Sequence, residues 1–134
     1  MSKSDGYNHK EGIVYKNQFH IIFCPKYRRK VLINGVDVRL KEILYETAIE
    51  NDITLKTVEV MPDHVHLFIE IDPRLAVHAA IKVLKAKTSR LLREEFPWLK
   101  SKIPSLWTRS YFCCTVGQIS DESIQQYIAD QKNK

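Results

Sequence analysis

In residues 64–71 (HVHLFIEI), every odd-numbered position from Val65 to Ile71 is aliphatic. Successive side chains of a β-strand point to opposite faces, so this spacing predicts a strand with one buried apolar face. His64 and His66 then lie side by side on the opposite face, roughly 6 to 7 Å apart at their α-carbons. An HxH pair of this kind is compatible with ordinary surface histidines and with a shared ligand site, so the rest of the chain must decide.

Three other stretches have the composition of strands. In the segment QFHIIFC, alternate positions from Phe19 onward are apolar and face a core, while His20 lies on the other side. Residues 53–60 form another strand, which a short Met-Pro-Asp corner joins to the histidine strand as a hairpin. The last strand is expected over residues 106–116. The chain therefore supplies four strands for one sheet.

Two helices follow from apolar residues that recur every three to four positions. The first is expected from Asp37 to about Asn51. The second is expected to run to about Glu95, with Asp72 as its N-cap and Pro73 at its first helical position. Each helix has one apolar stripe, so both should pack on the sheet.

A third, shorter helix is predicted near the end of the chain, over residues 121–131, with acidic residues in its first turn. Tyr127 and Gln131 are four residues apart and project from the same face as Ile124 and Ile128. A helix shorter than ~12 to 15 residues is marginal alone in water. It should therefore dock on the domain or on a partner chain.

The predicted order of elements is β-α-β-β-α-β, which is the plan of an α+β fold of the ferredoxin-like, or RRM-like, type. Two helices would cover one face of a four-stranded antiparallel sheet, and the histidines would lie on the open face. We expect one domain over residues 1–134. It has a loose lead-in at 1–12 and the tyrosine-bearing helix at 120–134.

Composition narrows the class of partner. The 134 residues include 21 Lys and Arg against 16 Asp and Glu, a formal charge of +5 that favours a polyanion such as nucleic acid. Three cysteines form no CxxC pair, and no apolar run approaches the ~20 residues of a membrane helix. We therefore expect a reduced, cytoplasmic protein without a membrane span, associated with the nucleoid when bound to DNA.

A basic cluster follows the first predicted strand. Lys26, Tyr27, Arg28, Arg29 and Lys30 place four cations around one aromatic ring. Clusters of this type bind phosphates while the ring stacks on a base. A solvated turn is the alternative interpretation.

Tyr127 is a candidate nucleophile. A phenol has a pKa of about 10, so roughly a thousandth is ionised at pH 7 and a site must supply about 4 kcal/mol to use it. A metal held by His64, His66 and the amide oxygen of Gln131 could lower that demand by acting as a Lewis acid on a phosphate. Attack by Tyr127 would give a phosphotyrosine link that conserves the ester energy.

The His64-Val65-His66 triplet, the cluster at 26–30, and Tyr127 followed by Gln131 together strongly resemble the TnpA transposases. These are the single-tyrosine HUH (His-hydrophobic-His) enzymes of small insertion sequences, and the resemblance covers nearly the whole chain. It implies site-specific cleavage and rejoining of single-stranded DNA at the element's ends. It also implies recognition of DNA hairpins, and a tyrosine joined to a 5′-phosphate that leaves a 3′-hydroxyl.

The resemblance further implies a Mg²⁺ or Mn²⁺ ion bound by His64, His66 and Gln131. It implies a homodimer in which one subunit supplies the histidines and the other supplies the tyrosine helix. The residues alone do not choose the ion, because imidazole suits Mn²⁺ or Zn²⁺ better than Mg²⁺. Unpaired edges of a small sheet are compatible with a dimer.

Two other functions are compatible with the sequence. A metallohydrolase with an HxHxD pattern would need an acid where Phe68 stands, although Asp63 and His78 are stray candidates. A non-catalytic nucleic-acid binder of the same fold, such as an RNA-recognition sheet or a non-mobile transposase relative, is the second. RNA-recognition sheets need stacking aromatics where this chain has histidines, and a relative that has lost its chemistry should have lost a histidine or Tyr127.

Overall fold

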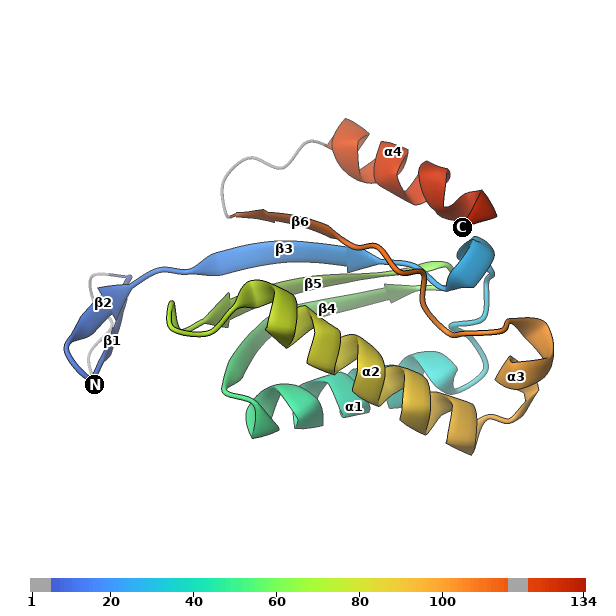
Figure 1. The fold of residues 1–134 in the computed structure, drawn as a ribbon, viewed down its shortest axis with the longest axis horizontal. Helices are drawn as coiled ribbons and strands as arrows, with labels where there is room; N and C mark the ends of the chain where they lie inside the picture. Colours follow the sequence, from blue (N-terminus) through green and yellow to red (C-terminus); the bar gives the residue numbers. More distant parts are fainter. Residues whose placement is uncertain (1–5, 116–120) are drawn as a thin grey trace.

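The computed structural model describes residues 6–115 and 121–134 and contains the expected four-stranded antiparallel sheet, in the order β4-β5-β3-β6 (Figure 1). This order, with β3 and β5 in the centre, confirms the ferredoxin-like α+β fold. The strands of this sheet are β3 (Gln18–Phe23), β4 (Ile53–Met61), β5 (His64–Ile71) and β6 (Phe112–Thr115).

Helices lie on both sides of the sheet. Two long helices, α1 (Val36–Glu50) and α2 (Val77–Glu95), cover one face, whereas α4 (Asp121–Asp130) lies on the other (Figure 1). A short helix, α3 (Trp98–Lys102), follows α2, and two single turns, η1 (Lys26–Arg28) and η2 (Gln131–Asn133), complete the set. Within the described part of the chain, no helix is long and apolar enough to cross a lipid bilayer.

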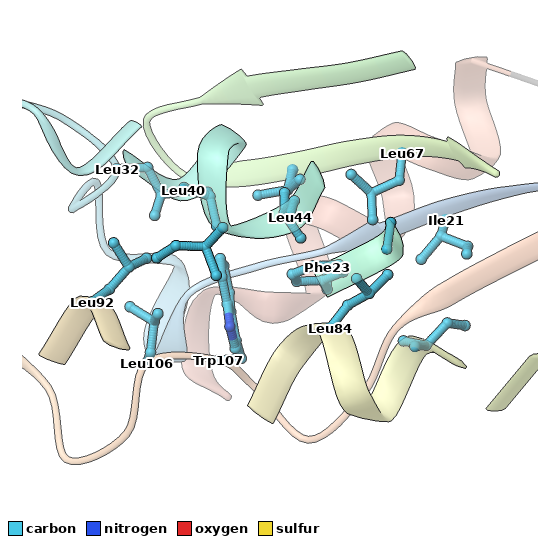
Figure 2. Packing of buried hydrophobic residues seen from close by; sticks show 14 of the residues in the cluster. Ile21, Phe23, Leu32, Leu40, Leu44, Leu67, Leu84, Leu92, Leu106 and Trp107 are labelled. Carbon is cyan, nitrogen blue, oxygen red and sulfur yellow. The ribbon is translucent and has the colours of Figure 1, made fainter. Parts of the chain in front are cut away.

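The main core lies between the sheet and the helix pair. Ile21 and Phe23 of β3 are fully buried there, as the alternation of that strand predicts. Leu44 of α1 and Leu84 of α2 meet them from the helical layer (Figure 2). Trp107 closes one end of this core, with its ring edge against Phe23 at 4.6 Å between centroids. The opposite face of β3 is therefore free to carry His20, Ile22 and the site described below.

The start of α2 differs from the prediction. The helix begins at Val77 rather than at Pro73, and Ala76 is its N-cap. Asp72 instead accepts hydrogen bonds from the backbone N–H of Arg74 at 2.9 Å and from its guanidinium. This local pairing satisfies the carboxylate within the loop, so Asp72 caps a turn and the helix starts one turn later.

The last strand is also shorter than predicted. Regular pairing with β3 covers Phe112–Thr115 only, while Trp107 forms an isolated bridge with Pro25. In β6, Phe112 lies opposite Ile22, so uniform pairing would place residue 109 opposite Pro25. The bridge to Trp107 shows that two extra residues are accommodated between these points, one more than in a simple β-bulge. We call residues 108–111 the β6 bulge.

Two further segments contain structure where none was predicted. Residues Asn8–Lys10 (β1) and Ile13–Tyr15 (β2) pair as a small antiparallel hairpin in place of a loose lead-in. The hairpin lies at the end of the molecule remote from η1 (Figure 1). The expected linker after α2 contains α3, whose Leu99 is fully buried. Both additions lie away from the open face.

Candidate active site on the open face of the sheet

His64 and His66 extend from the open face of β5, as their spacing predicts. Val65, between them, is fully buried in the main core, whereas both imidazoles are partly exposed. His66 lies opposite Ile22 of β3 and Glu59 of β4. The two histidines therefore stand in the middle of the sheet, at the end where β4 turns into β5.

The imidazole of His64 is oriented by a neighbouring carboxylate. Its Nδ1 lies 2.9 Å from Oδ1 of Asp63, a side chain that is only 20% exposed. A carboxylate can only accept, so Nδ1 carries the proton of the neutral ring and Nε2 keeps its lone pair. The other oxygen of Asp63 lies 3.5 Å from Nε of Arg28. One carboxylate thus contacts both the histidine and the basic cluster.

His66 has two polar neighbours. Its Nδ1 lies 3.5 Å from the largely exposed carboxylate of Glu59, and its Nε2 lies 3.2 Å from Nδ1 of His20. The His20 ring also stacks on Phe68, with 4.7 Å between centroids. Burial lowers the pKa of His66 below its usual value, against the opposing effect of Glu59. The ring is therefore held neutral, the form in which imidazole binds metals.

The predicted helix α4 docks on the same open face. Ile128 is 6% exposed and packs against Ile22 and Cys24 of the β3 segment, forming a small hydrophobic cluster separate from the main core. Ile124 and Tyr127 complete the packed side of the helix. The apolar spacing of the sequence therefore correctly identifies the face of α4 that docks.

Tyr127 and Gln131 form one hydrogen-bonded group with Ser110 of the β6 bulge. Ser110 Oγ donates to Gln131 Oε1 at 2.9 Å, so the hydroxyl of Tyr127, 2.8 Å away, donates to Ser110 Oγ. The Gln131 amide donates in turn to the Tyr127 carbonyl at 3.2 Å. Burial raises the pKa of the Tyr127 phenol above its usual value, so the free chain holds this group protonated.

Lys85 of α2 holds the β6 bulge from the helical side of the sheet. Its ammonium donates to the carbonyls of Thr108 at 2.7 Å and Ser110 at 3.0 Å. Burial lowers the pKa of Lys85 to about 8. These bonds fix the backbone where strand pairing is interrupted, and thereby the position of the Ser110 hydroxyl on the open face.

The histidine pair and the tyrosine group share a face without meeting. Phe112, Ile22 and His66 are neighbours on three adjacent strands, and the Tyr127 ring lies 5.9 Å from that of Phe112 between centroids. Phe112 and His66 are themselves two strand spacings apart, about 10 Å, and in the part of the chain that the structure describes no hydrogen bond or ring contact joins Tyr127 or Gln131 to either histidine. The structure therefore brings Tyr127 to Gln131, and His64 to His66, but leaves the two pairs apart.

The predicted basic cluster lies beside both pairs. Its first part forms η1, which packs against η2 near the C-terminus (Figure 1). Tyr27 is exposed, and its ring lies 5.2 Å from the ammonium of Lys26. A hollow of about 380 Å³ separates η1 from the β6 bulge, and cationic Lys26, Arg109 and Lys134 line it together with Ser110. The cluster thus borders the tyrosine group and, through Arg28, the histidine pair.

The donors present fit a metal only in part. His64 has a carboxylate at Nδ1, which leaves its Nε2 for a metal, whereas Nε2 of His66 contacts Nδ1 of His20. Within residues 6–115 and 121–134, no three His, Cys, Asp or Glu side chains converge as a metal site. A third protein donor would have to be of another type, and the amide oxygen of Gln131 is one, although Ser110 occupies it here.

Sequence reasoning missed several residues of this site. No sequence motif marks Ser110 or Lys85, because the roles of both residues depend on the irregular pairing of β6 with β3. Asp63 is, in the sequence alone, only a stray candidate for a metallohydrolase. The alternation of β3 does place His20 on the histidine face, and that signal could have paired it with His66.

Residues 13–131 match the family of IS200-like transposases, and the chain belongs to that family. It is 40% identical over 125 residues to the ISDra2 transposase TnpA of Deinococcus radiodurans, which covers 92% of this chain and 89% of the relative. It is 34% identical over 116 residues to the transposase of the insertion sequence IS200 from Salmonella typhimurium, covering 85% and 76%. These relatives identify the chain as a transposase.

Solved structures agree with this assignment. A transposase crystal structure from Deinococcus radiodurans superimposes with a TM-score of 0.86 at 38% identity and covers 92% of this chain and 97% of that one. A REP-associated tyrosine transposase, solved bound to a REP hairpin, gives a TM-score of 0.57 at 9% identity, over 90% and 68% of the two chains. The second likeness concerns the fold alone. The metallohydrolase and RNA-recognition alternatives are therefore set aside.

Proposed function

We propose that this transposase cleaves and rejoins single-stranded DNA at the ends of an insertion sequence through a 5′-phosphotyrosine intermediate formed on Tyr127. The observation that carries this proposal is the placement of Tyr127 and Gln131 on the same open face as His64 and His66. A half-buried tyrosine could be structural, but the Tyr127 hydroxyl shares Ser110 with Gln131, whose amide oxygen can bind a metal, and cationic side chains line the adjacent hollow. These are the parts of a phosphoryl-transfer site.

The metal in this proposal is Mg²⁺ or Mn²⁺, held by His64, His66 and Gln131. When bound, it would act as a Lewis acid on the scissile phosphate. Asp63 keeps the ring proton of His64 on Nδ1, so this histidine would present Nε2 to the ion, whereas Nε2 of His66 would exchange its contact with His20 for the ion. Gln131 must leave Ser110 to take part, because its Oε1 accepts from that hydroxyl in the free chain.

In the cleavage step, the Tyr127 oxygen bonds to phosphorus and the bond from phosphorus to the 3′-oxygen breaks. The phenolic proton is lost to solvent, and the departing 3′-oxygen takes up a proton to become a hydroxyl. One ester replaces another, so the reverse attack by a 3′-hydroxyl rejoins strands without ATP. Burial raises the pKa of Tyr127, so its phenolate needs a stabilising partner, and a bound metal ion would supply that stabilisation.

We further propose a homodimer with shared active sites. When α4 rests on its own sheet, the Tyr127 ring packs beside Phe112 of β6, and β3 lies between β6 and the strand that carries His66. We infer that α4 moves for catalysis, either within the chain or onto a second copy. Exchange of α4 between copies would place the tyrosine of one subunit at the histidines of the other, and β6 is an unshared edge strand in the four-stranded sheet that the structure describes.

The DNA substrate is proposed to carry hairpins at the element's ends. The REP-associated transposase of similar fold was solved bound to a REP hairpin. In this chain, we propose that Lys26, Tyr27, Arg28, Arg29 and Lys30 bind the DNA backbone and an unpaired base. Lys26 and Tyr27 of this cluster line the hollow beside Ser110, so a single strand bound there would lead to Tyr127.

A trapping experiment tests the proposal. The chain is incubated with single-stranded DNA from the flanks of its own gene and Mn²⁺, and a denaturation-resistant protein–DNA adduct is sought by gel and mass spectrometry. We expect the adduct on Tyr127, its loss in Tyr127→Phe, and its retention in Tyr45→Phe, which alters an exposed tyrosine of α1. Tyr127→Phe should still bind hairpin DNA.

The same experiment distinguishes a non-mobile relative that only binds hairpins. Such a protein would bind the DNA and give no adduct with Mg²⁺ or Mn²⁺. An adduct that persists in His64→Ala and His66→Ala would contradict the proposed metal dependence.

A further inference from the structure

Asp63 occupies an unusual position between the two parts of the proposed site. It ends the tight connection between β4 and β5, where Met61 pairs with His64. The preceding Pro62 carbonyl accepts from the backbone N–H of Leu32 at 3.1 Å, which ties the connection to the segment after the basic cluster. The Asp63 side chain is mostly buried in this corner and has a partner for each of its oxygens. Contacts to both oxygens therefore fix the orientation of the Asp63 carboxylate.

One oxygen of this carboxylate determines which nitrogen of His64 is free. Isolated neutral imidazoles exchange between two tautomers, and only a ring with its proton on Nδ1 offers Nε2 to a metal. The 2.9 Å contact with Asp63 Oδ1 selects that form. By comparison, Glu59 is 3.5 Å from His66 and 71% exposed, and Nε2 of His66 already contacts His20. Of the two histidines, His64 therefore has the more firmly fixed orientation and the Nε2 atom that is more available to a metal.

The other oxygen is directed to the basic cluster, at 3.5 Å from Arg28 Nε. Arg28 and Tyr27 both have positive φ, 51° and 57°, in a backbone region that has an energetic cost for non-glycine residues. A contact maintained against that cost links the cluster that we propose for DNA with the carboxylate that orients His64.

We propose that Asp63 is a positioning residue that holds His64 in its metal-binding tautomer and joins it to Arg28. The inference rests on the proposed metal site, because it assigns a role toward a ligand of that site. Removing Asp63 should weaken metal binding about 10- to 100-fold, the usual effect of losing a partner of a metal-bound histidine. It should do so without DNA present.

The test first determines the tautomer of the His64 ring and then measures the affinity for Mn²⁺. Histidine tautomers are read from long-range ¹H–¹⁵N spectra of the full chain without metal, and Mn²⁺ affinity is then measured by calorimetry. In Asp63→Ala, we expect the His64 proton to move to Nε2 and the Mn²⁺ affinity to fall. Asp63→Asn keeps an acceptor oxygen and should restore both readouts, while Asp52→Asn removes a carboxylate elsewhere and should change neither.

Separate results overturn the two proposals. An unchanged His64 tautomer in Asp63→Ala would refute the role of Asp63, whatever the metal affinity. If His64→Ala binds Mn²⁺ as tightly as the natural chain, the proposed metal site is refuted. The tautomer spectra would still test the role of Asp63, because they need no metal. If Asp63→Ala does not fold, Asp63→Ser, which suits a turn but is too short to reach His64, replaces it with the same expected outcomes.

Discussion

Docking of α4 should be removable without loss of the fold. Ile128 is 6% exposed and belongs to the small cluster with Ile22 and Cys24, whereas the main core lies on the other face of the sheet. We therefore expect Ile128→Ala to release α4 while leaving β3 and β5 in place. The ten residues of α4 are too few to stay helical alone, so the loss falls directly on docking.

The magnitude follows from the groups removed. Ile128→Ala deletes three carbons, which is about 2.4 kcal/mol at about 0.8 kcal/mol per methylene. Core substitutions of this type range over about 2–5 kcal/mol, and a small cluster near the surface can partly collapse, so we expect the low end, about 2–3 kcal/mol. The undocked fraction of α4 should then rise about 30- to 150-fold, at about 1.4 kcal/mol per tenfold.

Native-state hydrogen exchange measures this change segment by segment. The amides of α4 should exchange faster in Ile128→Ala by that factor, while those of β3 and β5 keep their protection. Ile49→Ala is the matched control, since it makes the same deletion on α1 at a side chain that is 78% exposed. Unchanged exchange in α4, or an equal increase in α4 and the central strands, would refute the view that α4 is a separately docked unit.

Two other predictions concern charge. Replacing Arg29 and Lys30 by Ala should weaken binding of a single-stranded oligonucleotide and flatten its log–log salt dependence by about 0.7 for each phosphate that the variant no longer neutralises, with Lys41→Ala on α1 as the control. An unaltered slope would make the cluster a solvated turn. Hydrogen bonds from Arg74 lower the pKa of Asp72 from 3.8 to about 2, so this carboxylate stabilises the fold above pH 3.8 and the contribution is lost as the pH falls toward 2. The difference in unfolding free energy between the natural chain and Asp72→Asn should therefore be constant near pH 6 and shrink through that window; a constant difference down to pH 2 would contradict it.

Periodicity predicted the parts of this protein that are set by burial. The alternation of β3 and β5 separates Phe23 and Val65 from His20, His64 and His66, because each strand has one face against the helices. The spacing of α4 likewise identified Ile128 as a docking residue. These features depend on which side of an element is apolar, and the sequence records that directly.

The remaining features depend on partners that are distant in sequence or on a competing local bond. The two extra residues of the β6 bulge become visible only when β6 pairs with β3 and Lys85 binds the carbonyls at 108 and 110. Asp72 has the residue type of an N-cap, yet its carboxylate accepts a hydrogen bond from Arg74 instead of capping the helix. The backbone of Tyr27 and Arg28 adopts a conformation that local propensity disfavours. Local rules therefore fail where a specific contact outweighs them.

Cys24 lies buried beneath α4, so the reactivity of its thiol can report movement of this helix. Cys24 is fully buried against Ile128, and burial raises the pKa of its thiol to about 12. A thiol reagent can reach it only when α4 lifts from the sheet. In a chain with Cys113 and Cys114 replaced by Ser, the rate of Cys24 alkylation should therefore measure how often α4 leaves the sheet. Under the proposed mechanism, in which α4 moves toward the histidines, DNA should accelerate this alkylation.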